Sequence, residues 1–254
     1  MQIKGTLAIL QKVVFELRYR RGYAYLDRCG RTLNAFSTQQ PEWVVRSAIS
    51  PQSAPLTSLK NGCTLNFSAT KFDLALEMTP GGDALSDSEI EGFSNQVYTA
   101  GELIIDELGL KEFERIGFRA WYLFPCKSDS DSYKFLADLG IFHISERFAA
   151  FIPGHLESIG LAAVFKGETS YRIALNQVEQ SAEVNSGQEI LRVRASKLHK
   201  NQKEVFLQQQ RVKKRQVANP QFAAMIDVDV FQDDPGSVNT NLPESPDSFL
   251  SRIG

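Results

Sequence analysis

The sequence has few of the residues from which common reaction centres are built. Its three cysteines, Cys29, Cys63 and Cys126, lie far apart, and no Cys-x-x-Cys pair or His–Cys cluster predicts a zinc site. The three histidines show no metal-ligand spacing either. Gly-x-Ser-x-Gly, His-Glu-x-x-His and Gly-rich phosphate-loop motifs are missing, so most hydrolase, kinase and NTPase classes lose support. We therefore expect no cofactor.

Long apolar runs and a strong net charge are missing as well. No window approaches the length of a membrane span, and the N-terminus has no apolar stretch of signal-peptide length. The net charge of -2 predicts no global attraction to nucleic acid or to an anionic membrane. Unpaired thiols fit a reducing compartment. These features predict a cytoplasmic protein that does not bind membranes.

What the sequence does contain is the pattern of a folded α+β protein. Hydrophobic residues make up 43% of the 254 residues, and 17 of them are Phe. Apolar residues alternate from Val13 to Tyr19, which predicts a strand with one buried face. The spacing of Leu26, Cys29, Leu33 and Phe36 predicts a helix with these four residues on one stripe.

The clearest predicted helix follows residue 86. Ser86 and Glu89 form a capping-box pattern, and Gly109 stands where a C-terminal cap belongs. Strands are predicted at 41–50, in two pieces over 63–78, at 114–125 with Pro125 as the end, in a hairpin over 158–178, at 189–195 and over 222–232. A loop is predicted around Pro51 and Pro55, a short helix near 131–140 and a polar helix over 196–216.

This order of elements predicts mainly antiparallel sheets with helices packed on one face. In the first half it indicates a split β-α-β, ferredoxin-like arrangement. We expect an N-terminal subdomain over 1–130, a strand-rich C-terminal subdomain over 131–232, and an extended tail over 233–254, because the tail is rich in Pro, Asp, Asn and Ser.

Asp227 and Asp229 are the candidate metal ligands. They alternate with apolar residues, so a strand places both carboxylates on one face about 7 Å apart. Such a pair could share a magnesium ion with water and a substrate phosphate. A strand with one solvent-facing side gives the same pattern, and no further acidic residue or phosphate loop completes a site. The sequence favours the solvent-facing strand.

Two basic segments are candidates for nucleic-acid binding. Near the N-terminus, arginines are interleaved with tyrosines, a composition that suits nucleic acid. Between residues 192 and 216, nine Lys or Arg residues accompany a single acid, Glu204. In each segment the sequence favours a solvated surface as the interpretation of the charges. The candidate residues are Arg18, Arg20, Arg21, Arg28, Lys200, Lys203, Arg211, Lys213 and Lys214.

Two short motifs resemble a family of sporadically distributed, uncharacterised bacterial proteins. In that family, a mid-chain strand of the type [IL]G[LF]R is followed later by a strand of the type DxD. Here, Ile116 to Arg119 reads IGFR and Asp227 to Asp229 reads DVD. After Arg119 the chain reads Ala-Trp-Tyr, where the family has an aromatic residue followed by Ile-Asn. The resemblance implies a bacterial setting and an accessory or defence-linked role, and it implies no catalytic residues.

The sequence therefore favours a binding protein over an enzyme. We expect a non-catalytic binding or assembly protein of a bacterial system, with a role in antiviral defence as one setting, which acts through a protein partner or as a homo-oligomer. The polar helix over 196–216 and the acidic tail are the predicted contact surfaces. One alternative is a nucleic-acid-binding protein or nuclease that uses the basic strand and helix. A second is a metal-dependent phosphate-handling enzyme that uses Asp227 and Asp229.

Overall fold

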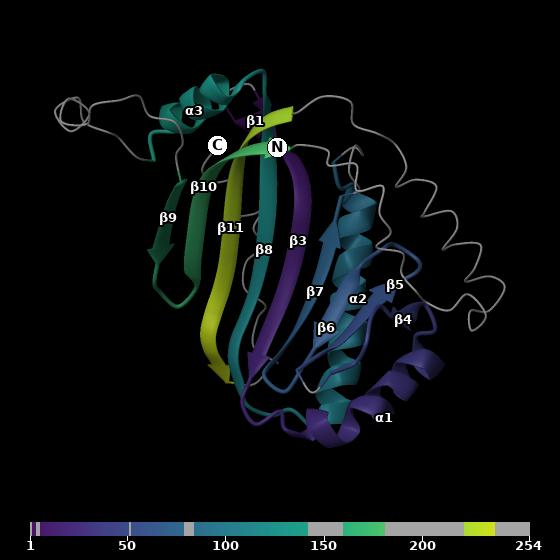
Figure 1. The fold of residues 1–254 in the computed structure, drawn as a ribbon. Coiled ribbons are helices and arrows are strands. Elements are labelled where there is room, and N and C mark those ends of the chain that lie inside the picture. The colour runs from purple at the N-terminus through teal and green to yellow at the C-terminus, as the bar shows by residue number, and fades with distance from the viewer. Residues whose placement is uncertain are drawn as a thin grey trace.

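A computed structural model describes residues 2–3, 6–50, 52–78, 84–141, 160–180 and 221–236. In these residues a nine-stranded sheet has the order β4-β5-β6-β7-β3-β8-β11-β10-β9, and every neighbouring pair is antiparallel (Figure 1). The predicted α+β class with mainly antiparallel strands is confirmed. The elements are β1 (Gln2–Ile3), β2 (Thr6–Leu7), β3 (Ile9–Tyr19), α1 (Ala24–Gln39), β4 (Trp43–Val45), β5 (Ala54–Ser58), β6 (Thr64–Phe67), β7 (Lys71–Glu77), α2 (Asp87–Leu108), β8 (Phe113–Cys126), α3 (Asp129–Asp138), β9 (Gly160–Phe165), β10 (Ser170–Gln180) and β11 (Gln221–Gly236).

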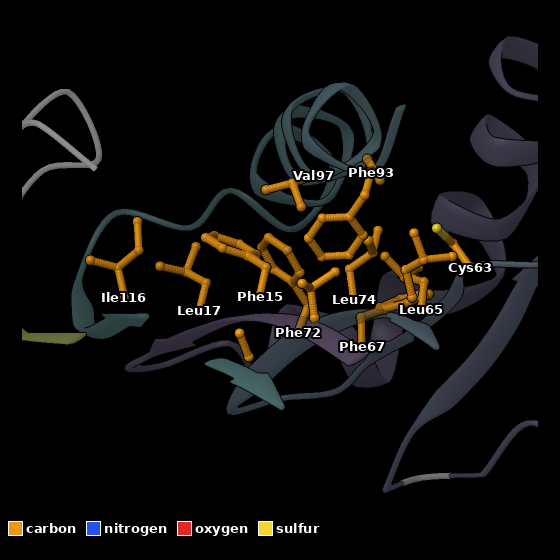
Figure 2. Packing of buried hydrophobic residues seen from close by; sticks show 14 of the residues in the cluster. Phe15, Leu17, Cys63, Leu65, Phe67, Phe72, Leu74, Phe93, Val97 and Ile116 are labelled. Atoms are coloured by element: carbon orange, nitrogen blue, oxygen red, sulfur yellow. The ribbon is translucent and has the colours of Figure 1, made fainter. Parts of the chain in front are cut away.

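The core lies on one face of this sheet, beneath the helices. On β3 the alternating residues from Val13 to Tyr19 are all buried, as predicted. Figure 2 shows Phe93 and Val97 of α2 above Phe15 of β3 and Phe72 of β7. The rings of Phe15 and Phe72 lie 5.6 Å apart. The predicted alternation therefore produces the apolar surface on which α2 packs.

The other two described helices lie on the same face. Tyr25 and Phe36 of α1 contact Phe67 of β6, with ring centroids 5.6 and 6.3 Å apart. Phe135 of α3 stacks on Phe124 of β8 at 4.8 Å. Side chains at these strand positions point to the same side as the core residues of β3, because the strands pair in register. The opposite face of the sheet carries charged residues together with some buried apolar ones, among them Leu123 and Phe231.

The ends of α2 follow the predicted capping pattern. Ser86 accepts a hydrogen bond from the backbone of Glu89, and the Glu89 carboxylate accepts one from the backbone of Ser86. Gly109 ends the helix in the left-handed conformation, with a φ of 65°. That conformation costs glycine nothing because it has no Cβ. This predicted helix is confirmed at both ends.

Some predicted elements need correction. Leu26, predicted on the buried stripe of α1, is 58% exposed, and Tyr25 and Thr32 are buried in addition to the predicted Phe36. The predicted Cys29 and Leu33 are partly buried against the core. The loop predicted around Pro55 contains β5, in which the Pro55 carbonyl accepts a hydrogen bond from Arg46 although proline cannot donate one. At its C-terminal end, β8 continues past Pro125 to Cys126.

The last described strand also runs further than predicted. β11 continues through Asp233 to Gly236, so the first four residues of the predicted tail belong to the sheet. The predicted strand at 189–195, the polar helix over 196–216 and the tail from 237 onward lie outside the described residues. The predicted division at residue 130 falls between β8 and β11, which are neighbours in one sheet. Among the described helices, none is long and apolar enough to cross a membrane.

Candidate functional site: an arginine–aspartate cluster

The candidate site lies on the sheet face opposite the helices. Ile226, Val228 and Val230 of β11 are buried in the core. Their neighbours Asp227 and Asp229 therefore point to the other face, because successive side chains of a strand alternate. β11 runs between β8 and β10 (Figure 1), so cross-strand partners are available from both sides.

Asp227 is the centre of the cluster. Its side chain is only 3% exposed, and Arg119 of β8 binds both of its oxygens. The distances are 2.7 Å from Nε to Oδ1 and 2.5 Å from Nη2 to Oδ2. Arg172 of β10 donates a further hydrogen bond from Nη1 to Oδ2 at 3.0 Å. A buried carboxylate thus joins guanidinium groups from the two strands that flank it.

Asp229 has a single arginine partner. Nη2 of Arg115 lies 2.6 Å from its Oδ2, and both side chains are largely buried. Arg115 reaches this carboxylate across the ring of Phe231, with its guanidinium carbon 3.8 Å from the ring centroid. Gly117 of β8 pairs with Phe231 across the two strands. Because a Cβ on Gly117 would lie 2.9 Å from the Phe231 Cβ, a glycine is needed for this close contact.

The pKa values of the cluster reflect its burial and its pairing. The hydrogen bond to Asp227 raises the pKa of Arg119, so its guanidinium carries a permanent charge. Burial raises the pKa of Asp229 above its ordinary value of 3.8, although Arg115 acts in the opposite direction. For Asp229, the loss of hydration outweighs the attraction to its arginine.

Asp229 should therefore give a small, inverted pH effect. An acid with a raised pKa binds a proton more readily in the folded chain than in the unfolded chain, so acidification favours the folded state through this group. As the pH falls from neutral toward 3.8, wild type should gain stability relative to Asp229→Asn. Denaturant unfolding of both proteins across this range measures the difference. A loss of relative stability on acidification would contradict the prediction.

Asp227 and Asp229, the predicted metal ligands, have arginines as their partners in the structure. Both oxygens of Asp227 and one oxygen of Asp229 are bound by arginines. Within the described ranges, no group of three or more His, Cys, Asp or Glu side chains could hold a metal ion. A divalent cation at this place would also have to approach three guanidinium charges. The geometry favours an ion-paired cluster.

The N-terminal arginines predicted to bind nucleic acid have partners of their own within the chain. Arg18 pairs with Glu16 at 2.7 Å, and Arg20 pairs with Glu114 at 2.8 Å. The other two contact α2 and the segment that follows it: Arg28 donates to the Glu107 carbonyl, and Arg21 pairs with Glu112. Three of these arginines are therefore engaged in ion pairs, and Arg28 in a hydrogen bond to the backbone. Lys200, Lys203, Arg211, Lys213 and Lys214 lie outside the described residues.

The arginine partners of Asp227 were not predicted from the sequence. Arg119 lies 108 positions before Asp227, and Arg172 lies 55 positions before it, so no local spacing connects them. A usable signal existed in the alternation of β8. Because the even-numbered residues from Ile116 to Phe124 are apolar, Arg115 and Arg119 had to share the polar face with Trp121.

A second candidate surface lies at the end of the sheet formed by β9. An apolar groove of about 340 Å³ lies on the helix side of β9 and β10, where neither α1 nor α2 covers the sheet. Val164 and Phe165 at the tip of β9 are 54% and 56% exposed. The groove is lined by Ile141, Leu161, Ala163, Phe165, Tyr171, Ile173 and Leu175.

Comparison with known proteins found no relative of this chain. No protein-family model, no curated protein and no solved structure matches the chain.

Proposed function

We propose that the chain is a non-catalytic assembly protein of a bacterial, defence-linked system, which acts through protein–protein contacts. The bacterial and defence-linked setting comes from the resemblance of the IGFR and DVD motifs. The observation that carries the binding role is the uncharged, apolar edge of the sheet at β9. Its occupant in this proposal is the β9 strand of a second copy of the chain.

The chemistry of β9 supports strand pairing. The six residues Gly160–Phe165 contain no charge and no proline. Among the described strands, β9 pairs only with β10, and no described strand pairs with its other edge. Edge strands that stay monomeric commonly carry charges, prolines or bulges that block such pairing. An antiparallel pair of two β9 strands would satisfy the backbone groups of this edge and place no like charges opposite each other.

The opposite edge of the sheet gives a contrast within the same molecule. There, β4 has only three residues, Trp43–Val45, and is flanked by Glu42 and Arg46. A short strand bordered by charges is a poor template for another strand. The apolar groove beside β9 adds a surface that a second copy could cover, because exposed apolar patches of this kind are typical of interaction sites. The two edges therefore support assembly at β9 and not at β4.

Val164→Lys should weaken the assembly by at least about tenfold, since a symmetric strand pair would bring the two added charges together. Sedimentation velocity or light scattering across a concentration series measures the dissociation constant. Val45→Lys, on the other edge strand, is the matched control and should leave it unchanged. Wild type that stays monomeric at every concentration, or equal assembly by Val164→Lys and wild type, would contradict the proposal.

The two alternative functions receive less support. The strand order β8-β3-β7-β6, with α1 and α2 in the connections, supports the ferredoxin-like arrangement proposed for a nucleic-acid-binding protein. The carboxylate and carbonyl partners of Arg18, Arg20, Arg21 and Arg28 favour intramolecular roles over phosphate contacts. The arginine partners of Asp227 similarly reduce the support for a metal-dependent enzyme.

A further inference from the structure

The arginine–aspartate cluster carries more positive than negative charge. Within the described part of the chain, Arg115, Arg119 and Arg172 share two carboxylates, those of Asp227 and Asp229. The neighbouring charges on the same face balance one another: Lys12 pairs with Glu77, Arg18 and Lys71 bind Glu16, and Lys71 also binds Asp73. We propose that Arg119 and Arg172 form a binding site for a small oxyanion, a phosphate or carboxylate group.

Asp227 gives this site its rigidity. Because one buried carboxylate holds both guanidinium groups, their positions are fixed before any ligand arrives. Arg119 uses two of its five N–H donors for Asp227, and Arg172 uses one. The side chains of Arg119 and Arg172 remain 39% and 35% exposed, whereas the carboxylate beneath them is 3% exposed. Both arginines therefore keep N–H donors beyond those that bind Asp227, on side chains that are partly accessible.

Unpartnered donors on β8 provide an independent observation. Arg115 Nε and Trp121 Nε1 are buried N–H groups with no hydrogen-bond acceptor among the residues that the structure describes. Buried donors in native proteins are almost always satisfied, so orphaned ones indicate a missing acceptor. Positive charge also gathers around Trp121, with Lys12 Nζ at 4.5 Å and the Arg119 guanidinium carbon at 5.3 Å from its ring. This face of β8 therefore has more hydrogen-bond donors than acceptors and more positive than negative charge, and a bound anion would satisfy both.

The geometry of the donors selects the class of anion. A guanidinium presents its N–H groups as a planar fork that matches two oxygens of a phosphate or carboxylate, and two forks from neighbouring strands suit an oxyanion better than chloride. A single negative charge would neutralise the cluster. The site requires no metal and no residue of the β9 edge, so it is independent of the proposed assembly.

Calorimetric titration with inorganic phosphate and, separately, with acetate tests the site at chloride-matched ionic strength. At least one of the two anions should bind wild type saturably, and the stronger ligand identifies the member of the class. Arg172→Gln should weaken binding by at least about tenfold, the loss expected for a charge-assisted hydrogen bond. Arg172→Lys keeps the positive charge but loses the planar pair of N–H donors. Its affinity for the anion should therefore lie between those of wild type and Arg172→Gln.

Lys166→Gln is the matched control, because Lys166 is an exposed cation that pairs with Asp233 of β11 away from the proposed site. It should bind the anion as wild type does. Thermal unfolding without ligand verifies that each variant is folded. The proposal is overturned if neither anion binds wild type, or if Arg172→Gln and Arg172→Lys both bind as tightly as Lys166→Gln.

Discussion

Asp227→Asn should lower the free energy of unfolding by about 3–5 kcal/mol, the range for removing one partner of a buried ion pair. Asparagine fills nearly the same volume but carries no charge, so Arg119 and Arg172 would lose the carboxylate that both of them bind. Their guanidinium groups would then repel each other on adjacent sides of β11. For a chain of this size, the melting temperature should fall by roughly 10 °C.

Asp229→Asn is the matched control for this substitution. It lies on the same strand and the same face, two residues further along, but has Arg115 as its single arginine partner. Burial raises the pKa of Asp229, which means that its charge is already disfavoured in the folded state. Its replacement should therefore lower the free energy of unfolding by less than the replacement of Asp227 does. Denaturant unfolding of the three proteins at neutral pH measures both differences.

The contrast between the two aspartates also tests the interpretation of the cluster. If the aspartates served only as solvent-facing residues of β11, both substitutions would change the unfolding free energy by less than about 0.5 kcal/mol. Equal effects of Asp227→Asn and Asp229→Asn would therefore contradict the central role assigned to Asp227. A loss confined to Asp227→Asn would support it.

The elements that the sequence predicted well are those with local causes. The alternation in β3 and the capping box of α2 are contained within a few neighbouring residues, and both are found in the structure. β5 was missed because Pro55 is a poor strand residue, and its place in the sheet comes from pairing with β4 and β6. The start of the buried stripe of α1 was misplaced at Leu26, because the position of β6 beneath the helix decides which side is covered.

The candidate site was predicted only in part for the same reason. Alternation placed Asp227 and Asp229 on one face of a strand, and the structure agrees. Their partners depend on β8 and β10 lying on either side of β11, which no local pattern encodes. The uncharged character of β9 was visible in the sequence, but its position at the edge of the sheet was not. The order of strands in the sheet therefore could not be predicted from local sequence patterns.

That strand order also brings the two resemblance motifs together. Arg119 of the IGFR motif binds Asp227 of the DVD motif, and Gly117 of the first motif faces Phe231 just beyond the second. The glycine has a steric role at this contact. A Cβ on Gly117 would lie 2.9 Å from the Phe231 Cβ and 3.2 Å from the Val230 carbonyl oxygen. Neither atom is the far end of a flexible side chain, so β8 and β11 would have to separate.

Gly117→Ala should therefore lower the free energy of unfolding by about 1–3 kcal/mol, the cost of overpacking a close contact. Glycine-to-alanine changes without a clash usually stabilise by about 0.4–1 kcal/mol, because they restrict the unfolded chain. Gly160→Ala provides this control, since a Cβ on Gly160 of β9 would meet only Asn176 Oδ1 at an ordinary 3.6 Å. Denaturant unfolding should give opposite signs for the two variants, whereas a stabilised Gly117→Ala would show that β8 and β11 have room at this contact.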